Sequence, residues 1–200
     1  MENKSEHGDM ARALWARGVF PHKFSWLIDN PLRRLVLSPE TLAKRLSLSE
    51  SSHILELGPG SGYFSAALAT RVPRGRLELF DLQPEMLAKA ERKLRAGGHH
   101  NVGYTTGNAS EDLPFPDGHF DVAFLSSVLG EVPDVGRCLR SLHRVLRPTG
   151  TLAFHESISD PDLVRFETIQ SLVESQGFKF QQRWGRPWNY KATFAKSESN

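Results

Sequence analysis

The sequence predicts an α/β protein whose helices cover both faces of a mostly parallel sheet. From residue 53 to residue 175, short apolar segments alternate with helical patterns, which indicates parallel strands joined by right-handed crossovers. A glycine-rich turn joins the first apolar segment to the first helix. Two further strand patterns close the chain, and the link between them is too short for a crossover, so one strand near the C-terminus must run antiparallel. Together these observations predict a doubly wound, Rossmann-like sheet of seven strands.

Each element follows from a local pattern in the chain. Strands are predicted over residues 53–57, 76–81, 101–106, 119–127, 151–156, 178–183 and 190–195, because each is short and mainly apolar or bounded by turn residues. Helices are predicted over residues 63–71, 84–95, 134–146 and 161–175. The second helix has Pro84 in its first turn and is stopped by Gly97 and Gly98. The third has a row of arginines on one side, typical of a solvent-exposed face: Arg137, Arg140, Arg144 and Arg147.

The length of 200 residues fits one domain with room for a short extra segment. Residues 51–196 form the predicted ligand-binding domain. Residues 11–50, which prolines break into short helical stretches rich in Trp and Phe, are predicted to form an N-terminal helical lid. The polar residues 1–10 and 197–200 are expected to be disordered.

Composition and charge argue against several classes of protein. The net charge is +2, and residues 1–50 supply the whole excess with eight Lys/Arg against six Asp/Glu, so a nucleic-acid partner is not expected. No apolar run approaches the length of a membrane-spanning helix, and residues 1–10 lack the apolar centre of a signal peptide. The single cysteine, Cys138, cannot form an internal disulfide, which favours a cytoplasmic location. The eight histidines show no metal-ligand spacing, so no metal is expected.

The glycine-rich turn is the most informative feature of the sequence. It reads Gly-Pro-Gly-Ser-Gly over residues 58–62, with Glu56 just before it and Asp81 at the end of the second strand. Such a turn lets a ligand approach the backbone closely, and a carboxylate at the end of the second strand can accept hydrogen bonds from both hydroxyls of a ribose. A dinucleotide-binding fingerprint would need a glycine where the chain has Tyr63. Because Glu56 would repel a pyrophosphate, the site favours a cationic nucleoside.

In combination, four segments resemble the motifs of class I S-adenosylmethionine-dependent methyltransferases. They are Glu-Leu-Gly-Pro-Gly-Ser-Gly over residues 56–62, Leu-Phe-Asp-Leu-Gln-Pro-Glu-Met-Leu over 79–87, Gly-Asn-Ala-Ser-Glu-Asp-Leu-Pro-Phe-Pro-Asp-Gly-His-Phe-Asp over 107–121, and Leu-His-Arg-Val-Leu-Arg-Pro-Thr-Gly over 142–150. The resemblance covers about residues 53–195 and is strongest to the small single-domain enzymes related to quinone-biosynthesis methyltransferases. It implies S-adenosylmethionine as cofactor, S-adenosylhomocysteine as product, and methyl transfer by in-line displacement to a small, partly apolar acceptor. The segment 11–50 would then cover the acceptor pocket.

The resemblance implies two groups of cofactor-binding residues, of which the first serves the methionyl end. Glu56 and the backbone of Gly58, Gly60 and Gly62 would hold this end of the cofactor. Leu125, at the end of the fourth strand, would lie near the methionyl group.

The second group serves the nucleoside end of the cofactor. Asp81 would bind the ribose hydroxyls, and Leu82 would lie against the adenine face. Asn108 and the backbone amide of Ala109 would meet the adenine edge. Many relatives have Asp at the position of Asn108, but an amide oxygen also accepts a hydrogen bond from the adenine amino group.

Three further residues have two interpretations each. Tyr63 either packs against the sheet or places its ring near the sulfonium, where cation–π attraction would stabilise the ligand. Glu131, where relatives often carry histidine, is either a carboxylate at a helix start or a general base. His155, at the end of the fifth strand, is either an incidental polar residue or a general base.

Two other functional classes remain open at the level of sequence. One is a non-catalytic protein that keeps the methyltransferase fold as a binding or partner-activating module. The intact Glu56, the three glycines and Asp81 count against it. The other is a nicotinamide-dependent oxidoreductase, and the missing glycine at position 63 counts against that.

Overall fold

The computed structural model describes residues 39–46, 48–157 and 163–197. The disorder predicted for residues 1–10 and for 198–200 of the tail lies outside these ranges, and so does most of the lid predicted over residues 11–50. The predicted ligand-binding domain is described apart from residues 158–162.

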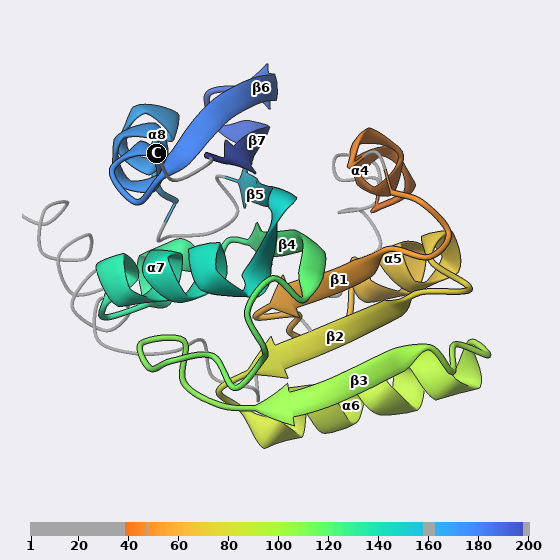
Figure 1. Ribbon diagram of the computed structural model, residues 1–200. Helices are drawn as coiled ribbons and strands as arrows, with labels where there is room; N and C mark the ends of the chain where they lie inside the picture. The colour runs from red at the N-terminus through yellow and green to blue at the C-terminus, as the bar shows by residue number, and fades with distance from the viewer. Residues whose placement is uncertain (1–38, 47, 158–162, 198–200) are drawn as a thin grey trace, which may run out of the picture.

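In the described part of the chain, seven strands form one sheet in the order β3-β2-β1-β4-β5-β7-β6 (Figure 1). The strands are β1 (His53–Leu57), β2 (Arg76–Asp81), β3 (Val102–Thr106), β4 (Phe120–Ser126), β5 (Leu146–Ser157), β6 (Phe178–Arg186) and β7 (Asn189–Lys196). β1 pairs in parallel with β2 and β4, whereas β7 pairs antiparallel with β5 and with β6. The predicted doubly wound sheet with one antiparallel strand near the C-terminus is confirmed.

Helices cover both faces of this sheet (Figure 1). On one face lie α4 (Pro39–Arg45), α5 (Ser65–Arg71) and α6 (Pro84–Ala96), and on the other lie α7 (Val135–Val145) and α8 (Phe166–Glu174). Because side chains alternate along a strand, Phe124 of β4 packs in the core under α5, while Leu125 packs in the core under α7. Burial on both faces explains why the central strands are almost wholly apolar.

Several element boundaries differ from those predicted, and three of them have a clear physical reason. Helix α5 begins at Ser65, because residues 61–64 still belong to the glycine-rich turn. Helix α8 begins at Phe166, since Arg165 is extended with φ −65° and ψ 146°. Strand β5 begins at Leu146, which pairs with Phe120 of β4 ahead of an irregularity in the register. Local patterns do not report this pairing.

The arginine row of α7 binds acidic and carbonyl groups of the same chain. Arg137 pairs with Asp112, and Arg144 pairs with Asp117, both in the loop between β3 and β4. Arg144 also donates to the carbonyl oxygens of Leu113 and Phe115, at 2.6 and 2.8 Å. The sequence predicted a merely solvated face, and it placed Arg147 on it, but Arg147 belongs to β5 and pairs with Asp121 of β4. Arg137 and Arg144 therefore hold the loop between β3 and β4 against α7.

Replacing Arg144 with alanine is expected to lower the free energy of unfolding by about 2 kcal/mol, because the carbonyls of Leu113 and Phe115 lose their charged donor. Urea unfolding measures the change. Arg140→Ala, one turn away on the exposed side of the same helix, is the matched control and should stay within about 0.5 kcal/mol of the parent. Equal losses in the two variants would show that the loop does not depend on Arg144.

Candidate active site

The glycine-rich turn lies at the carboxyl end of β1, between β2 and β4, where the order of the strands reverses. Ligands of open α/β sheets bind at this switch point. Gly58, Gly60 and Gly62 have φ values of 63°, 56° and 79°, in the left-handed region that glycine adopts without strain. The amide of Gly58 donates to the carbonyl of Phe80 at 2.8 Å, which ties the turn to the end of β2.

The three glycines serve different neighbours. A Cβ atom on Gly58 would lie 2.4 Å from Cγ2 of Val128, and one on Gly62 would lie 3.2 Å from Cβ of Ala90. On Gly60 the nearest atom would be Cε of Met86, at 3.8 Å. Gly58 and Gly62 therefore lie close against other parts of the protein, whereas a Cβ atom on Gly60 would make only an ordinary contact with the end of a flexible side chain.

Glu56 is a buried carboxylate beside this turn, with 2% of its surface exposed. The hydroxyl of Ser65, the first residue of α5, donates to Glu56 Oε2 at 2.6 Å. Burial raises the pKa of Glu56 to about 7, and the nearby charge of Asp81 acts in the same direction. The sequence did not identify Ser65 as part of the site. Its only signal is a serine at the start of the helix that follows the turn.

Asp81 provides a second carboxylate at the end of β2, with 8% of its surface exposed. It accepts backbone hydrogen bonds from Gln83, Gly60 and Leu82, the first at 2.9 Å. Burial raises the pKa of Asp81 above its ordinary value, and these hydrogen bonds oppose the rise. The side chain of Leu82 is 47% exposed beside it. The structure thus sets a buried carboxylate next to an exposed apolar surface.

Asn108 and Ala109 follow β3 at the same edge of the sheet. The amide of Gly107 donates to the carbonyl of Asp81 at 3.0 Å, which holds this loop against β2. Asn108 Oδ1 accepts from the backbone amide of Ser110 at 2.9 Å. That oxygen has a second lone pair, so it can still accept a hydrogen bond from a ligand.

The end of β4 holds the predicted residue Leu125 and is followed by Ser127, which the sequence did not single out. The side chain of Leu125 is fully buried on the face opposite Glu56, so only its backbone borders the turn. Ser127 has φ 54°, the one positive value at a non-glycine residue in the described chain, and its buried hydroxyl has no hydrogen-bond partner there. Strained backbone of this kind clusters at functional sites. The signal in the sequence is a pair of serines at the end of an apolar strand.

The three residues with two interpretations lie in different surroundings. Tyr63 is half-buried beside the core of the α5 face, with its ring edge-on to Phe64. Glu131 lies in a short 3-10 helix, η2 (Leu129–Glu131), and is half-buried. It does not cap α7, because Asp134 accepts the hydrogen bond that caps that helix. His155 is fully buried and lies within hydrogen-bond distance of Ser126.

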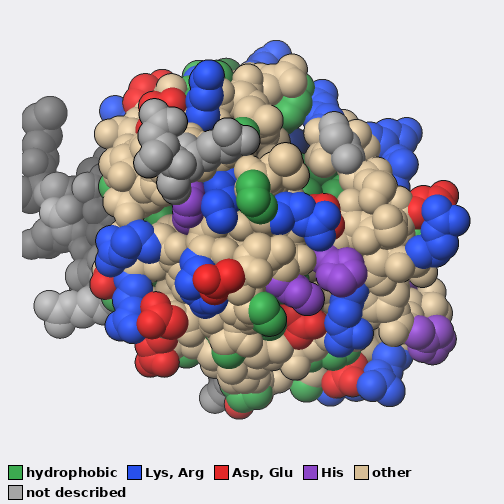
Figure 2. All heavy atoms as spheres, viewed as in Figure 1, with side chains coloured by type: hydrophobic (Ala, Val, Ile, Leu, Met, Phe, Trp, Pro, Cys, Tyr) green, Lys and Arg blue, Asp and Glu red, His purple; other side chains and the backbone are tan. Residues whose placement is uncertain are grey.

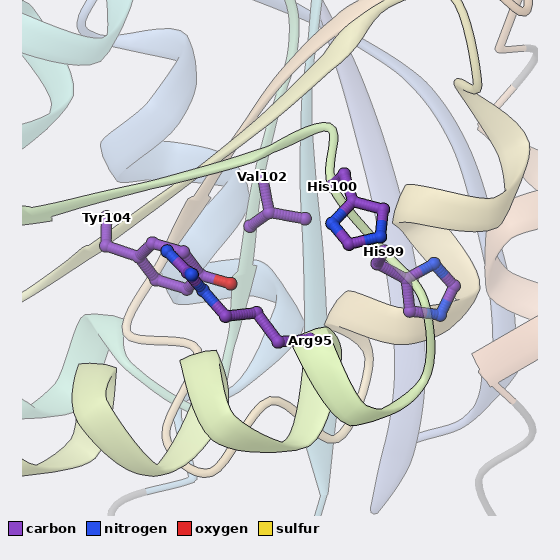
Figure 3. A pocket seen from close by; sticks show the side chains of 5 residues that line it. All are labelled: Arg95, His99, His100, Val102 and Tyr104. Carbon is purple, nitrogen blue, oxygen red and sulfur yellow. The ribbon is translucent and has the colours of Figure 1, made fainter.

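A different hollow lies at the opposite end of the edge strand β3 (Figure 3). It is lined by Arg95, His99, His100, Val102 and Tyr104, which come from the end of α6, the following loop and β3. Arg95 is already paired with Glu91 at 2.7 Å. Because the hollow lies at the other end of β3, it takes no part in the site at the glycine-rich turn.

Metal and membrane signals are lacking in the described residues. No three His, Cys, Asp or Glu side chains within residues 39–46, 48–157 and 163–197 gather in a way that could hold a metal ion. None of the helices described there is long and apolar enough to cross a membrane. Two buried carboxylates at a glycine-rich turn instead suit an organic ligand that carries positive charge and hydroxyl groups.

The methyltransferase domain family matches residues 55–154, half of the chain, and this match includes most of β1, the glycine-rich turn and Asp81. The chain belongs to this family. The resemblance to the class I S-adenosylmethionine-dependent methyltransferase family is thereby confirmed. Neither the nicotinamide-dependent oxidoreductase nor the non-catalytic module is favoured.

Similar proteins include two curated bacterial methyltransferases. Demethylmenaquinone methyltransferase of Geobacillus stearothermophilus is 33% identical over 138 residues, covering 68% of this chain and 58% of the relative. Ubiquinone/menaquinone biosynthesis C-methyltransferase UbiE of Shewanella frigidimarina is 37% identical over 134 residues, covering 66% and 51%. The chain thus spans about half the length of the curated relatives it matches. A solved S-adenosylmethionine-dependent methyltransferase of Aquifex aeolicus has the same fold, with a TM-score of 0.82, 21% identity, and coverage of 89% of this chain and 100% of that one.

Proposed function

We propose that this methyltransferase-family chain transfers a methyl group from S-adenosylmethionine to a ring carbon of a small quinol. The observation that carries the cofactor assignment is the pair of buried carboxylates, Glu56 and Asp81, at the glycine-rich turn. The names of the relatives support the acceptor, because both describe methyltransferases that act on quinones or in their biosynthesis.

The residues at the turn fit each part of the cofactor. Glu56 faces the methionyl end, whose ammonium and neighbouring sulfonium are positive, so an ionised carboxylate attracts it. In this proposal Asp81 accepts the ribose hydroxyls and Leu82 covers one face of the adenine, which their exposed fractions of 8% and 47% support. Asn108 Oδ1 and the amide of Ala109 meet the adenine edge. When bound, S-adenosylmethionine supplies an activated methyl group, so the protein's main task is to place the acceptor in line with it.

The acceptor must be electron-rich at the carbon that is methylated. A quinone ring is itself electrophilic, so only its reduced form, the quinol or its anion, can attack a sulfonium methyl group. In the described chain, three large apolar side chains are exposed, and Leu82 and Trp188 are two of them. Trp188 is 48% exposed in the turn between β6 and β7, at the edge of the sheet that carries the site. An aromatic surface there suits a flat, partly apolar ring.

The charge distribution supports a small-molecule acceptor. On the face shown in Figure 2, Lys and Arg side chains are interspersed with Asp and Glu, and they form no continuous basic stripe. Nucleic-acid-binding proteins usually carry such a stripe. Cys138 is a buried free thiol, which supports a reducing location, and we propose that the reaction takes place in the cytoplasm. The segment 11–50 remains our proposed lid over the acceptor.

The test of the proposed function begins with Asp81→Ala. This variant should bind S-adenosylmethionine and S-adenosylhomocysteine at least tenfold more weakly, because two hydrogen bonds to a charged acceptor are lost at about 1.5–3 kcal/mol each. Isothermal titration calorimetry measures both ligands, with NAD and NADP as controls that the parent protein should not bind. Tight binding of a dinucleotide alone would reject the cofactor assignment.

The acceptor is tested with a short-chain demethylmenaquinone kept reduced by dithionite. The parent protein should release S-adenosylhomocysteine and yield a product heavier by one methylene unit, measured by mass spectrometry. The same compound kept oxidised should not react. A protein that binds S-adenosylmethionine but leaves the quinol unchanged would have a different acceptor.

A further inference from the structure

Three polar side chains form a hydrogen-bonded row across the carboxyl end of β4 and β5 and the start of β7. Ser126 Oγ lies 2.9 Å from His155 Nδ1, and His155 Nε2 lies 3.3 Å from Asn189 Oδ1. Strand pairing sets this arrangement, because Ser126 is directly opposite His155 in the β4–β5 ladder. The three side chains come from strands that lie next to one another in the sheet.

The direction of both hydrogen bonds follows from Asn189. Its Oδ1 atom can only accept, so His155 Nε2 must carry the hydrogen. In a neutral imidazole the other nitrogen, Nδ1, then holds a free lone pair. Ser126 therefore donates its hydroxyl hydrogen to His155, and lone pairs on Ser126 Oγ remain to accept a proton from a ligand.

The row begins next to the cofactor site and continues into the interior. Ser126 is half-buried, whereas His155 is fully buried, with its ring 5.4 Å from that of Phe64 at the end of the glycine-rich turn. The two residues after Ser126 are the strained Ser127 and Val128, which packs over Gly58. Within the row, Ser126 is therefore the residue nearest in sequence to Val128, which packs over the glycine-rich turn. His155 is the next residue of the row and is shielded from solvent.

We propose that Ser126 and His155 relay the proton that the acceptor loses during methylation, with Asn189 as the positioning residue for the imidazole. This inference rests on the proposed function. The O–H bond of the acceptor breaks as its proton moves to Ser126 Oγ, and the electron pair stays on the acceptor oxygen, which makes the ring carbon nucleophilic. At the same time the Ser126 O–H bond breaks and its proton moves to His155 Nδ1. The ring carbon bonds to the methyl group as the bond between that methyl group and the cofactor sulfur breaks. The imidazolium keeps its Nε2–H donated to Asn189 and, because His155 is fully buried, returns its Nδ1 proton through Ser126 to the acceptor oxygen. The hydrogen on the methylated carbon leaves to water, which restores the aromatic ring.

The relay assigns separate tasks to three residues. Ser126 is the catalytic residue, because it alone meets the acceptor. His155 stores the proton, as general bases commonly do in proteins, and acts through Ser126. Asn189 fixes the tautomer by accepting from Nε2. If the row were purely structural, loss of the Ser126 hydroxyl would change folding and ligand affinity, whereas the relay predicts a loss confined to kcat.

A matched pair of variants tests this difference. Ser126→Thr keeps the hydroxyl on a β-branched side chain, and Ser126→Val has the same shape without it. With the demethylmenaquinol probe, kcat of Ser126→Val should be at least a hundredfold below that of Ser126→Thr. The KM for the quinol and the affinity for S-adenosylhomocysteine should stay within about threefold. Equal kcat values in the two variants would overturn the relay.

A second readout does not depend on turnover. Nitrogen NMR of the histidine side chains, with His155→Gln used for assignment, reports which ring nitrogen carries the hydrogen when S-adenosylhomocysteine is bound. We expect hydrogen on Nε2 and a free lone pair on Nδ1, and Asn189→Leu should disturb this preference while Asn189→Asp preserves it. Hydrogen on Nδ1 of His155 in the parent protein would overturn the relay even if the quinol is methylated. A parent protein that has the Nε2 tautomer but leaves the quinol unchanged would instead reject the proposed acceptor, and with it the quinol as the source of the proton.

Discussion

Glu56→Gln is expected to weaken cofactor binding and, at pH 8, to raise the free energy of unfolding of the ligand-free protein. The loss of a charge-assisted contact to the methionyl ammonium should lower affinity by about tenfold to a hundredfold. Glutamine has no charge to bury, and its amide oxygen still accepts from Ser65. One substitution would thus make the protein more stable at pH 8 and weaken its binding of the cofactor.

The sign of the stability change follows from the pKa of Glu56. Burial raises it from an ordinary 4.5 to about 7, so between these values the folded protein holds a proton that the unfolded chain has released. The stabilisation is full below pH 4.5 and is lost as the pH rises through about 7. Above pH 7 the ionised carboxylate therefore destabilises the fold by up to about 3 kcal/mol, which Glu56→Gln removes.

Urea unfolding at pH 8 and pH 5 measures this effect. The variant should exceed the parent in stability at pH 8, and the difference should shrink at pH 5. Glu78→Gln is the matched control, because Glu78 is half-buried in β2, where it contacts Arg76 and Thr105 away from the turn. It should show neither the gain at pH 8 nor weaker binding of S-adenosylhomocysteine. A Glu56→Gln protein that is less stable than the parent at pH 8 would contradict the assigned burial cost.

The same group makes cofactor affinity depend on pH in the parent protein. The ionised form of Glu56 attracts the cationic cofactor, so affinity should rise as the pH increases through about 7 and should fall by up to about tenfold per pH unit below it. Calorimetry between pH 5.5 and 8.5 follows this trend. In Glu56→Gln the slope should be lost over that range.

Gly58→Ala is expected to lower the free energy of unfolding by about 2–5 kcal/mol and to weaken cofactor binding. Two penalties combine here. The backbone at φ 63° is strained for alanine by about 1–2 kcal/mol, and the new Cβ would lie 2.4 Å from Cγ2 of Val128, so the core must shift. Because Val128 follows Ser126 and Ser127, that shift also displaces the end of β4.

Gly98→Ala and the double variant Gly58→Ala/Val128→Ala separate the two penalties. Gly98 also has a positive φ, 78°, but a Cβ there meets nothing within 4 Å, so its loss should be only about 1–2 kcal/mol. The double variant removes the clash and should be more stable than the sum of the two single variants predicts. Urea unfolding and S-adenosylhomocysteine calorimetry give both quantities. If Gly58→Ala and Gly98→Ala lower the free energy of unfolding equally, the contact with Val128 does not contribute to the loss in Gly58→Ala.

Much of the fold could be predicted because its signals are local. A parallel strand buried on both faces is a short apolar segment, as in residues 53–57, and a helix such as that beginning at Pro84 shows one apolar face and a glycine stop. Element ends were harder to predict. The early start of β5 at Leu146 depends on pairing with Phe120 of another strand.

In the site, the residues that could be predicted from the sequence are those identified by their position in a motif. Glu56, the three glycines and Asp81 stand next to strand ends, and the topology brings every parallel strand end to the same edge. Their roles toward the cofactor remain proposals, as do those of Tyr63, Glu131 and His155.

The side chains that meet across the sheet could not be predicted from the sequence and are known from the fold alone. Ser65 reaches Glu56 from nine residues away, Ser126 meets His155 across 29 residues, and Asn189 meets His155 across 34. The structure also places the side chain of Leu125 in the core on the α7 face, opposite to Glu56, because a shift of one residue along a strand exchanges its two faces. The physical reason is that periodicity fixes which elements form, whereas hydrogen bonds between strands depend on register and on the packing of elements far apart in the chain.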